Sequence, residues 1–78
     1  MLDSKLIGRI LQQKRQEKGL SQEVASSFAD IGRTHLSAIE RGKRTPTLET
    51  FFRLSYALKT KPSKLIKKIE EEMGEEFM

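Results

Sequence analysis

The sequence contains no cysteine, only one histidine and no long apolar run. Without a thiol there is no disulfide and no thiolate nucleophile, and one histidine offers too few ligands for a zinc site. A membrane span needs about 18 consecutive apolar residues, and the first four residues lack the basic and apolar blocks of a signal peptide. These absences predict a cytoplasmic protein that has no membrane segment, binds no metal and uses no cofactor.

The chain is short, and its 78 residues allow one small domain. We expect one domain over residues 1–78, with a core at about residues 4–66 and a C-terminal helix with an acidic end over residues 63–78. Glycine occurs only singly, so there is no phosphate-cradling loop, and no nucleophile is accompanied by a suitable base. The sequence therefore predicts a binding protein rather than an enzyme.

Charge is unevenly distributed along the chain. Residues 1–69 contain all 15 Lys and Arg residues but only 6 acidic residues, which leaves a formal charge of +9. A basic body favours a polyanionic partner such as nucleic acid, although a solvated lysine face is the alternative. The last nine residues are acidic instead, with glutamates from Glu70 to Glu76. This end leaves open a second class of function, an antitoxin or protein-interaction module that binds a basic protein partner.

Apolar residues at helical spacing, separated by capping and helix-breaking residues, predict an all-α fold. We expect five helices, at about residues 4–18, 21–29, 33–41, 47–58 and 63–73. The second is only about two turns long and must pack against a neighbour, with Val24 or Ala25 and Phe28 on its buried side. The stripe expected to face the core from the fourth helix consists of Leu48, Phe51, Leu54, Ala57 and Leu58.

Asp30, Ile31 and Gly32 separate the second helix from the third. Asp tolerates a left-handed backbone and Gly permits a sharp turn, so the chain is expected to reverse here. In the third helix Leu36 and Ile39 face the core, which leaves an outer face of polar and small residues. Such a pair of short helices is typical of a helix-turn-helix, although any small helical bundle can contain one.

Two segments make this interpretation more specific. They are KGLSQE at residues 18–23 and RTHLSAIERG at residues 33–42, the latter followed by Lys43, Arg44 and Pro46. Together they resemble the Cro/C1-type, or XRE-type, helix-turn-helix family over about residues 4–66. Within that family the opening and the end of the third helix look most like the controller proteins of restriction-modification systems.

The resemblance implies a five-helix, lambda-repressor-like bundle in which helices 2 and 3 form the helix-turn-helix. It further implies a sequence-specific transcriptional regulator that binds double-stranded DNA as a homodimer at a pseudo-palindromic operator. A restriction-modification controller and a phage-type repressor are both compatible with this resemblance. Ser26 stands where the family usually has Ala, and its hydroxyl is expected to bond to a backbone carbonyl one turn earlier.

Base contacts are expected from the outer face of the third helix. The guanidinium of Arg33 can donate two parallel bonds to O6 and N7 of guanine, and the methyl groups of Thr and Ala can touch the thymine methyl. An Arg at a helix N-terminus opposes the helix dipole, which favours a functional role. For the other residues, plain helix surface is the alternative. The expected base-reading set is Arg33, Thr34, Ser37 and Ala38.

Contacts to phosphates or to the flanks of the site are expected from a second set. Free N–H groups at the start of the second helix and a glutamine amide can hold one phosphate, although Ser21 can serve simply as a cap. The resemblance places the loop after the third helix beside the DNA backbone, where solvated charge is the alternative. The set comprises Ser21, Gln22, His35, Arg41, Lys43 and Arg44.

Two further features concern the framework of the protein. The resemblance implies a structural ion pair between Arg15 and Glu40 that ties the first helix to the end of the third. Aromatic residues at i and i+4 on the fourth helix lie off its apolar stripe, and uncovered apolar strips tend to be interfaces. The expected homodimer interface consists of Phe52, Tyr56, Ile66, Ile69 and Met73. Alternatively, the last helix buries these residues within one subunit.

Overall fold

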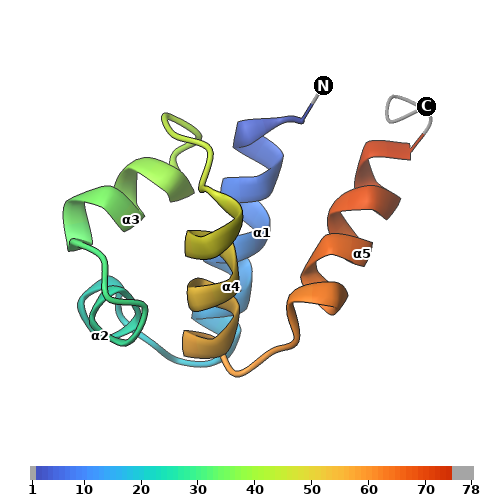
Figure 1. Ribbon diagram of the computed structural model, residues 1–78. Coiled ribbons are helices and arrows are strands. Elements are labelled where there is room, and N and C mark those ends of the chain that lie inside the picture. The colour runs from blue at the N-terminus through green and yellow to red at the C-terminus, as the bar shows by residue number, and fades with distance from the viewer. Residues whose placement is uncertain (1, 75–78) are drawn as a thin grey trace.

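The computed structural model describes residues 2–74, and this part of the chain forms five α-helices and no strand. The all-α prediction is therefore confirmed, and each expected helix is present to within two residues at either end. The helices are α1 (Ser4–Glu17), α2 (Gln22–Phe28), α3 (Arg33–Glu40), α4 (Leu48–Ala57) and α5 (Pro62–Met73) (Figure 1). Among the described residues no helix has the length and apolar character that crossing a membrane requires.

Side chains at the helix starts explain where three of the helices begin. The carboxylate of Asp3 accepts hydrogen bonds from the backbone N–H groups of Lys5 and Leu6, at 3.0 and 3.2 Å. The hydroxyls of Ser21 and Thr47 cap α2 and α4 in the same way. Each such cap satisfies a backbone donor that has no partner within the helix. The start of α3 at Gly32 has no side-chain cap.

The five helices share one apolar core. Helix α1 packs against α3 on one side and α5 on the other, and α4 packs against α2 and α5. In Figure 1 α3 therefore lies at one edge of the molecule and α5 at the other. The core residues are Leu6, Ile7, Ile10, Leu11, Ala25, Ala29, Leu36, Ile39, Phe51, Leu54, Ala57, Leu58, Leu65, Ile69 and Met73.

The expected burial was wrong at Phe28 and Leu48, which are 70% and 69% exposed. Of the two alternatives for the buried side of α2, Ala25 is buried and Val24 is 41% exposed. The buried side of α2 consists of small residues instead, because this short helix is packed against both α3 and α4. Ser26 is one of them, and its hydroxyl donates to the carbonyl of Glu23 at 3.2 Å, as expected.

The turn between α2 and α3 follows the sequence-based interpretation. Asp30 has a φ of +57°, which places it in the left-handed region that Asp tolerates. The N–H of Ile31 then donates to the carbonyl of Ser26 at 3.0 Å, and the Ile31 side chain packs against the core. This pattern closes the end of α2 and directs the chain into α3.

The close approach of α1 and α3 depends on Gly8. A Cβ atom at this position would lie 2.2 Å from the carbonyl oxygen of Ile39 and 2.7 Å from that of Glu40. Both atoms belong to the backbone at the end of α3, so no side-chain movement could relieve the contact. Gly8 therefore sets the distance at which α1 supports α3.

We expect Gly8→Ala to lower the free energy of unfolding by about 3 kcal/mol, because overpacking costs more than the roughly 1 kcal/mol that Ala gains in helix propensity. Thermal denaturation followed by circular dichroism measures the loss. The control is Gly32→Ala, where the added methyl meets nothing within 4 Å and the cost should stay below about 1 kcal/mol. Equal melting temperatures for the two variants would contradict the close approach.

Candidate nucleic-acid interface

The outer face of α3 is free of the other helices. Leu36 and Ile39 are buried on its inner side, whereas Arg33, Thr34 and His35 are exposed. Ser37 and Ala38, one turn further along, are half-buried. Eight residues at a rise of 1.5 Å make a helix about 12 Å long, which is close to the width of the DNA major groove.

A buried ion pair holds the C-terminal end of α3. The Nε atom of Arg15 lies 2.6 Å from one carboxylate oxygen of Glu40, and its Nη2 atom lies 3.0 Å from the other. The Glu40 side chain is only 1% exposed and that of Arg15 11%. The Nη1 atom of Arg15 also donates to the carbonyl of Leu20 at 2.9 Å. The expected ion pair is present, and it joins α1, α3 and the connection that leads into α2.

Gln22 belongs to the same network. Its amide nitrogen donates to the carboxylate of Glu40 at 2.9 Å, so the start of α2 is joined directly to the end of α3. From the sequence, Gln22 is predicted only as a phosphate contact. The available signal was chemical, because a carboxylate can accept about four hydrogen bonds and Arg15 supplies only two of them. The second amide N–H of Gln22 makes no hydrogen bond within residues 2–74.

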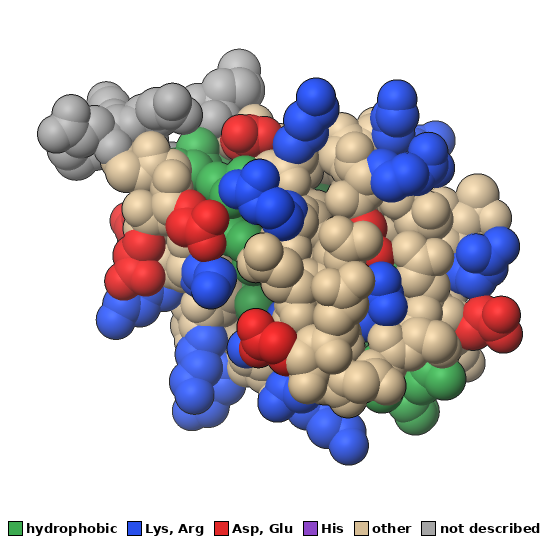
Figure 2. Space-filling view, turned by 180° about the vertical axis from the view of Figure 1, so that it is seen from behind, with side chains coloured by type: hydrophobic (Ala, Val, Ile, Leu, Met, Phe, Trp, Pro, Cys, Tyr) green, Lys and Arg blue, Asp and Glu red, His purple; other side chains and the backbone are tan. Residues whose placement is uncertain are grey.

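Arg41 is folded back along α3. Its Nε atom lies 3.3 Å from both the carbonyl oxygen and the hydroxyl oxygen of Ser37. Arg33, Lys43 and Arg44 are exposed, as Arg41 is, and in the described part of the chain no carboxylate lies within 4 Å of them. Figure 2 shows Lys and Arg side chains gathered at the upper right of the molecule. A concentration of unpaired cations beside α3 creates a positive potential there.

The loop after α3 returns close to its outer face. Arg44 lines a shallow hollow together with Thr34, His35 and Ala38 of α3. Residues expected to read bases and residues expected to contact the flanks are thus brought together in one place. Ser21 lies at the start of α2, where its hydroxyl accepts the N–H of Val24 at 3.1 Å.

The expected dimer residues fall into two groups. Phe52, Tyr56 and Ile66 are 39%, 67% and 45% exposed, whereas Ile69 and Met73 are buried in the core of the subunit. For Ile69 and Met73 the alternative of burial within one subunit is therefore correct, because α5 packs these side chains against the rest of the bundle.

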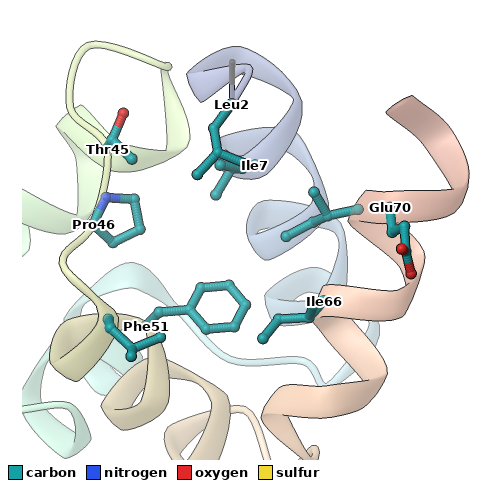
Figure 3. A pocket seen from close by; sticks show the side chains of 9 residues that line it. Leu2, Ile7, Thr45, Pro46, Phe51, Ile66 and Glu70 are labelled. Atoms are coloured by element: carbon teal, nitrogen blue, oxygen red, sulfur yellow. The ribbon is translucent and has the colours of Figure 1, made fainter. Parts of the chain in front are cut away.

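Near Ile66 lies an apolar groove that the sequence pattern does not predict. It lies between the N-terminal segment, the start of α4 and α5 (Figure 3). Leu2 and Leu48 are exposed beside it, together with Ile66. Phe52 and Tyr56 follow Leu48 along α4 at intervals of four residues, which places the three on one side of that helix. The exposed apolar residues Leu2, Leu48, Phe52, Tyr56 and Ile66 are called the α4–α5 surface below.

Only part of the acidic C-terminal end lies within the described residues. Glu70, Glu71 and Glu72 are exposed on α5, and Glu72 lies 3.7 Å from Arg9 of α1 within the same subunit. Glu75 and Glu76 lie outside the described residues. Nothing in this arrangement supports the protein partner that the acidic composition left open.

Comparisons with known proteins agree with the fold and with the position of the two short helices. A family model described as helix-turn-helix matches residues 11–65, which include α2, the turn and α3. The chain belongs to the Cro/C1-type helix-turn-helix family. This confirms the resemblance drawn from the two sequence segments.

Three similar proteins span nearly the same length. An uncharacterized HTH-type transcriptional regulator, y4dJ of Sinorhizobium fredii, is 36% identical over 86% of this chain and 87% of its own. The control protein C.MunI of a Mycoplasma species is 39% identical over 83% and 89%. The crystal structure of the restriction-modification controller protein C.AhdI from Aeromonas hydrophila is 33% identical, covers 81% of this chain and 96% of its own, and has a TM-score of 0.78.

We expect Glu40→Ala to destabilise the protein by about 3 to 5 kcal/mol, because it leaves Arg15 buried without its carboxylate and Gln22 without its acceptor. Chemical denaturation of the variant measures the loss. The control is Glu49→Ala, which removes an exposed carboxylate from its pair with Arg53 and should cost less than about 1 kcal/mol. A Glu40 variant that is no less stable than the Glu49 variant would show that the ion pair does not support the fold.

Proposed function

We propose that the chain is a transcriptional regulator that binds a pseudo-palindromic DNA operator as a homodimer. The observation that carries the proposal is the outer face of α3, which presents the exposed Arg33 and whose hollow is lined by Arg44 of the following loop. The Arg15–Glu40 pair and Gln22 hold this face in position. An immobile reading face loses little conformational entropy on binding, which favours specific contact.

In this proposal α3 enters the major groove and Arg33 reads a guanine through O6 and N7. Lys43 and Arg44 contact phosphates, and so do the start of α2 and the free amide N–H of Gln22. Ser37 contributes less than its position suggests, because its hydroxyl already accepts a bond from Arg41. His35 is exposed beside the hollow and contacts the flank of the site.

Two of the similar proteins support one class of regulator. C.MunI and C.AhdI are named as control or controller proteins, the latter of a restriction-modification system. Both match more than four fifths of this chain, so the resemblance is not confined to the helix-turn-helix. We therefore favour a restriction-modification controller over a phage-type repressor.

The α4–α5 surface provides the homodimer contact. A two-fold axis through this surface would leave the α3 helices of both subunits exposed, because α3 and α5 lie at different edges of the bundle (Figure 1). Two such helices about 34 Å apart would fit successive major grooves on one side of the duplex.

We expect binding-site selection from a random duplex pool to enrich an inverted repeat, and Arg33→Ala to lose discrimination at one guanine in each half-site by about 1 to 3 kcal/mol. The matched control is Arg53→Ala, an exposed arginine on α4 that should retain the wild-type sequence. Binding without any enriched sequence would contradict the proposal.

We expect Lys43→Ala to act differently from the Arg33 variant, because a phosphate contact carries no sequence information. Affinity should fall for all sequences. The slope of log K against log salt concentration should become less negative by about 0.9 per subunit between about 0.05 and 0.2 M salt. Fluorescence anisotropy on the selected duplex measures the slope. An unchanged slope would show that Lys43 does not contact a phosphate.

We expect Tyr56→Glu to weaken the dimer at least tenfold. In each subunit a charge replaces an aromatic side chain whose burial at the interface contributes about 1.5 to 3 kcal/mol. Sedimentation equilibrium measures the dissociation constant. Phe28→Glu is the control, since Phe28 is equally exposed but lies on α2. If the dimer dissociates in Phe28→Glu but not in Tyr56→Glu, the interface lies on α2 instead.

A further inference from the structure

The loop between α3 and α4 is attached to the start of α1 (Figure 1). The hydroxyl groups of Ser4 and Thr45 are hydrogen-bonded to each other, although the two residues lie 41 positions apart in the chain. Earlier in the loop, Gly42 has a φ of +77° and packs so closely that an added Cβ atom would lie 2.8 Å from the Cα atom of Lys5. Two neighbouring residues of α1 therefore contact the loop at two separate points.

The charged part of the loop lies between these two contacts. Lys43 and Arg44 follow the first contact and precede the second, and both are exposed. The N–H of Lys43 still donates to a carbonyl of α3 at 2.9 Å. In the described part of the chain the bond between Ser4 and Thr45 is the only hydrogen bond that involves Arg44, Thr45 or Pro46. The position of this stretch therefore depends on Ser4.

We propose that Ser4 is a positioning residue for DNA binding, which holds the loop so that Lys43 and Arg44 reach the phosphates. The inference rests on the proposed function, in which these two residues contact phosphates. A loop that is ordered beforehand loses little conformational entropy on binding, whereas a free loop must be ordered at that moment. The bond between Ser4 and Thr45 thus raises the affinity for the operator without contacting DNA.

The first test is the affinity of Ser4→Ala for the selected operator, measured by fluorescence anisotropy. We expect it to fall about fivefold for each half-site, the loss expected when the backbone of about one residue must be ordered during binding. Ser4→Thr keeps the hydroxyl group and should restore the wild-type affinity. The matched control is Ser63→Ala, because Ser63 also lies in the first turn of a helix but is exposed. Wild-type affinity in Ser4→Ala, or an equal loss in Ser63→Ala, overturns the inference.

A double-mutant cycle separates positioning from direct contact with DNA. In a protein that already carries Lys43→Ala and Arg44→Ala, the loop has no phosphate contact left to position. Adding Ser4→Ala to this protein should therefore lower the affinity by less than about twofold, which is the usual limit of additivity. A Ser4 hydroxyl that contacted a phosphate itself would cost the same affinity in both backgrounds, and such additive losses overturn the inference.

The free protein supplies an independent readout. NMR relaxation of the backbone N–H groups of Arg44 and Thr45 reports motion on the picosecond to nanosecond timescale. Their order parameters should fall in Ser4→Ala but not in Ser63→Ala, and those of α3 should stay at the wild-type values. Unchanged order parameters in the loop of Ser4→Ala overturn the positioning role.

Failure of this inference differs from failure of the proposed function. If no operator is selected, or if Lys43→Ala together with Arg44→Ala leaves the affinity unchanged, the proposed DNA contacts are overturned. If the operator is bound and these two substitutions weaken binding while Ser4→Ala does not, only the role of Ser4 is overturned.

Discussion

The buried carboxylate of Glu40 is the interaction on which the helix-turn-helix depends. Arg15 reaches it from α1 and Gln22 from the start of α2, while Glu40 itself ends α3. Helices of seven and eight residues are too short to be stable alone, so their relative position must come from tertiary contacts. One nearly inaccessible carboxylate supplies part of that constraint through directional bonds, which apolar packing alone cannot provide. The turn at Asp30 holds the end of α2 beside the start of α3, and Glu40 holds the end of α3 beside the start of α2.

Close packing provides the remaining constraint. Gly8 lets α1 lie against the backbone of α3, and Ala25 and Ser26 let α2 fit between α3 and α4. The consequence is that bulky residues on α2 have no place inside, so Val24 and Phe28 lie at the surface. Closely packed protein interiors tolerate neither added nor misplaced side-chain volume. Contacts on the buried side of α3 thus hold its exposed face in position, and the residues of the exposed face remain available for a ligand.

The sequence predicted the helices well and the burial less well. Longer helices repeat their apolar pattern over several turns, and Asp30 and Gly32 mark the turn clearly, so element positions were recoverable. A seven-residue helix gives less than two full repeats, so the pattern left Val24 and Ala25 as alternatives and wrongly placed Phe28 on the buried side of α2. The ion pair followed only from the family resemblance, because residues 25 apart give no local signal. The role of Gln22 and the burial of Ile69 and Met73 depend on how distant helices meet, which spacing along one helix does not encode.

The separation of the two exposed surfaces bears on how such a small regulator would be controlled. The face of α3 and the α4–α5 surface belong to different helices, and the core connects them. If the dimer is the form that occupies the operator, then occupancy depends on the monomer–dimer equilibrium and rises more steeply than in proportion to total concentration. A short chain with an apolar surface can in this way respond to its own abundance. The extra affinity of such a dimer would arise because binding of one half-site raises the effective concentration of the second α3 at the other half-site. Dimer strength and operator affinity would then be adjustable by substitutions on separate helices, a property suited to a protein that regulates by concentration.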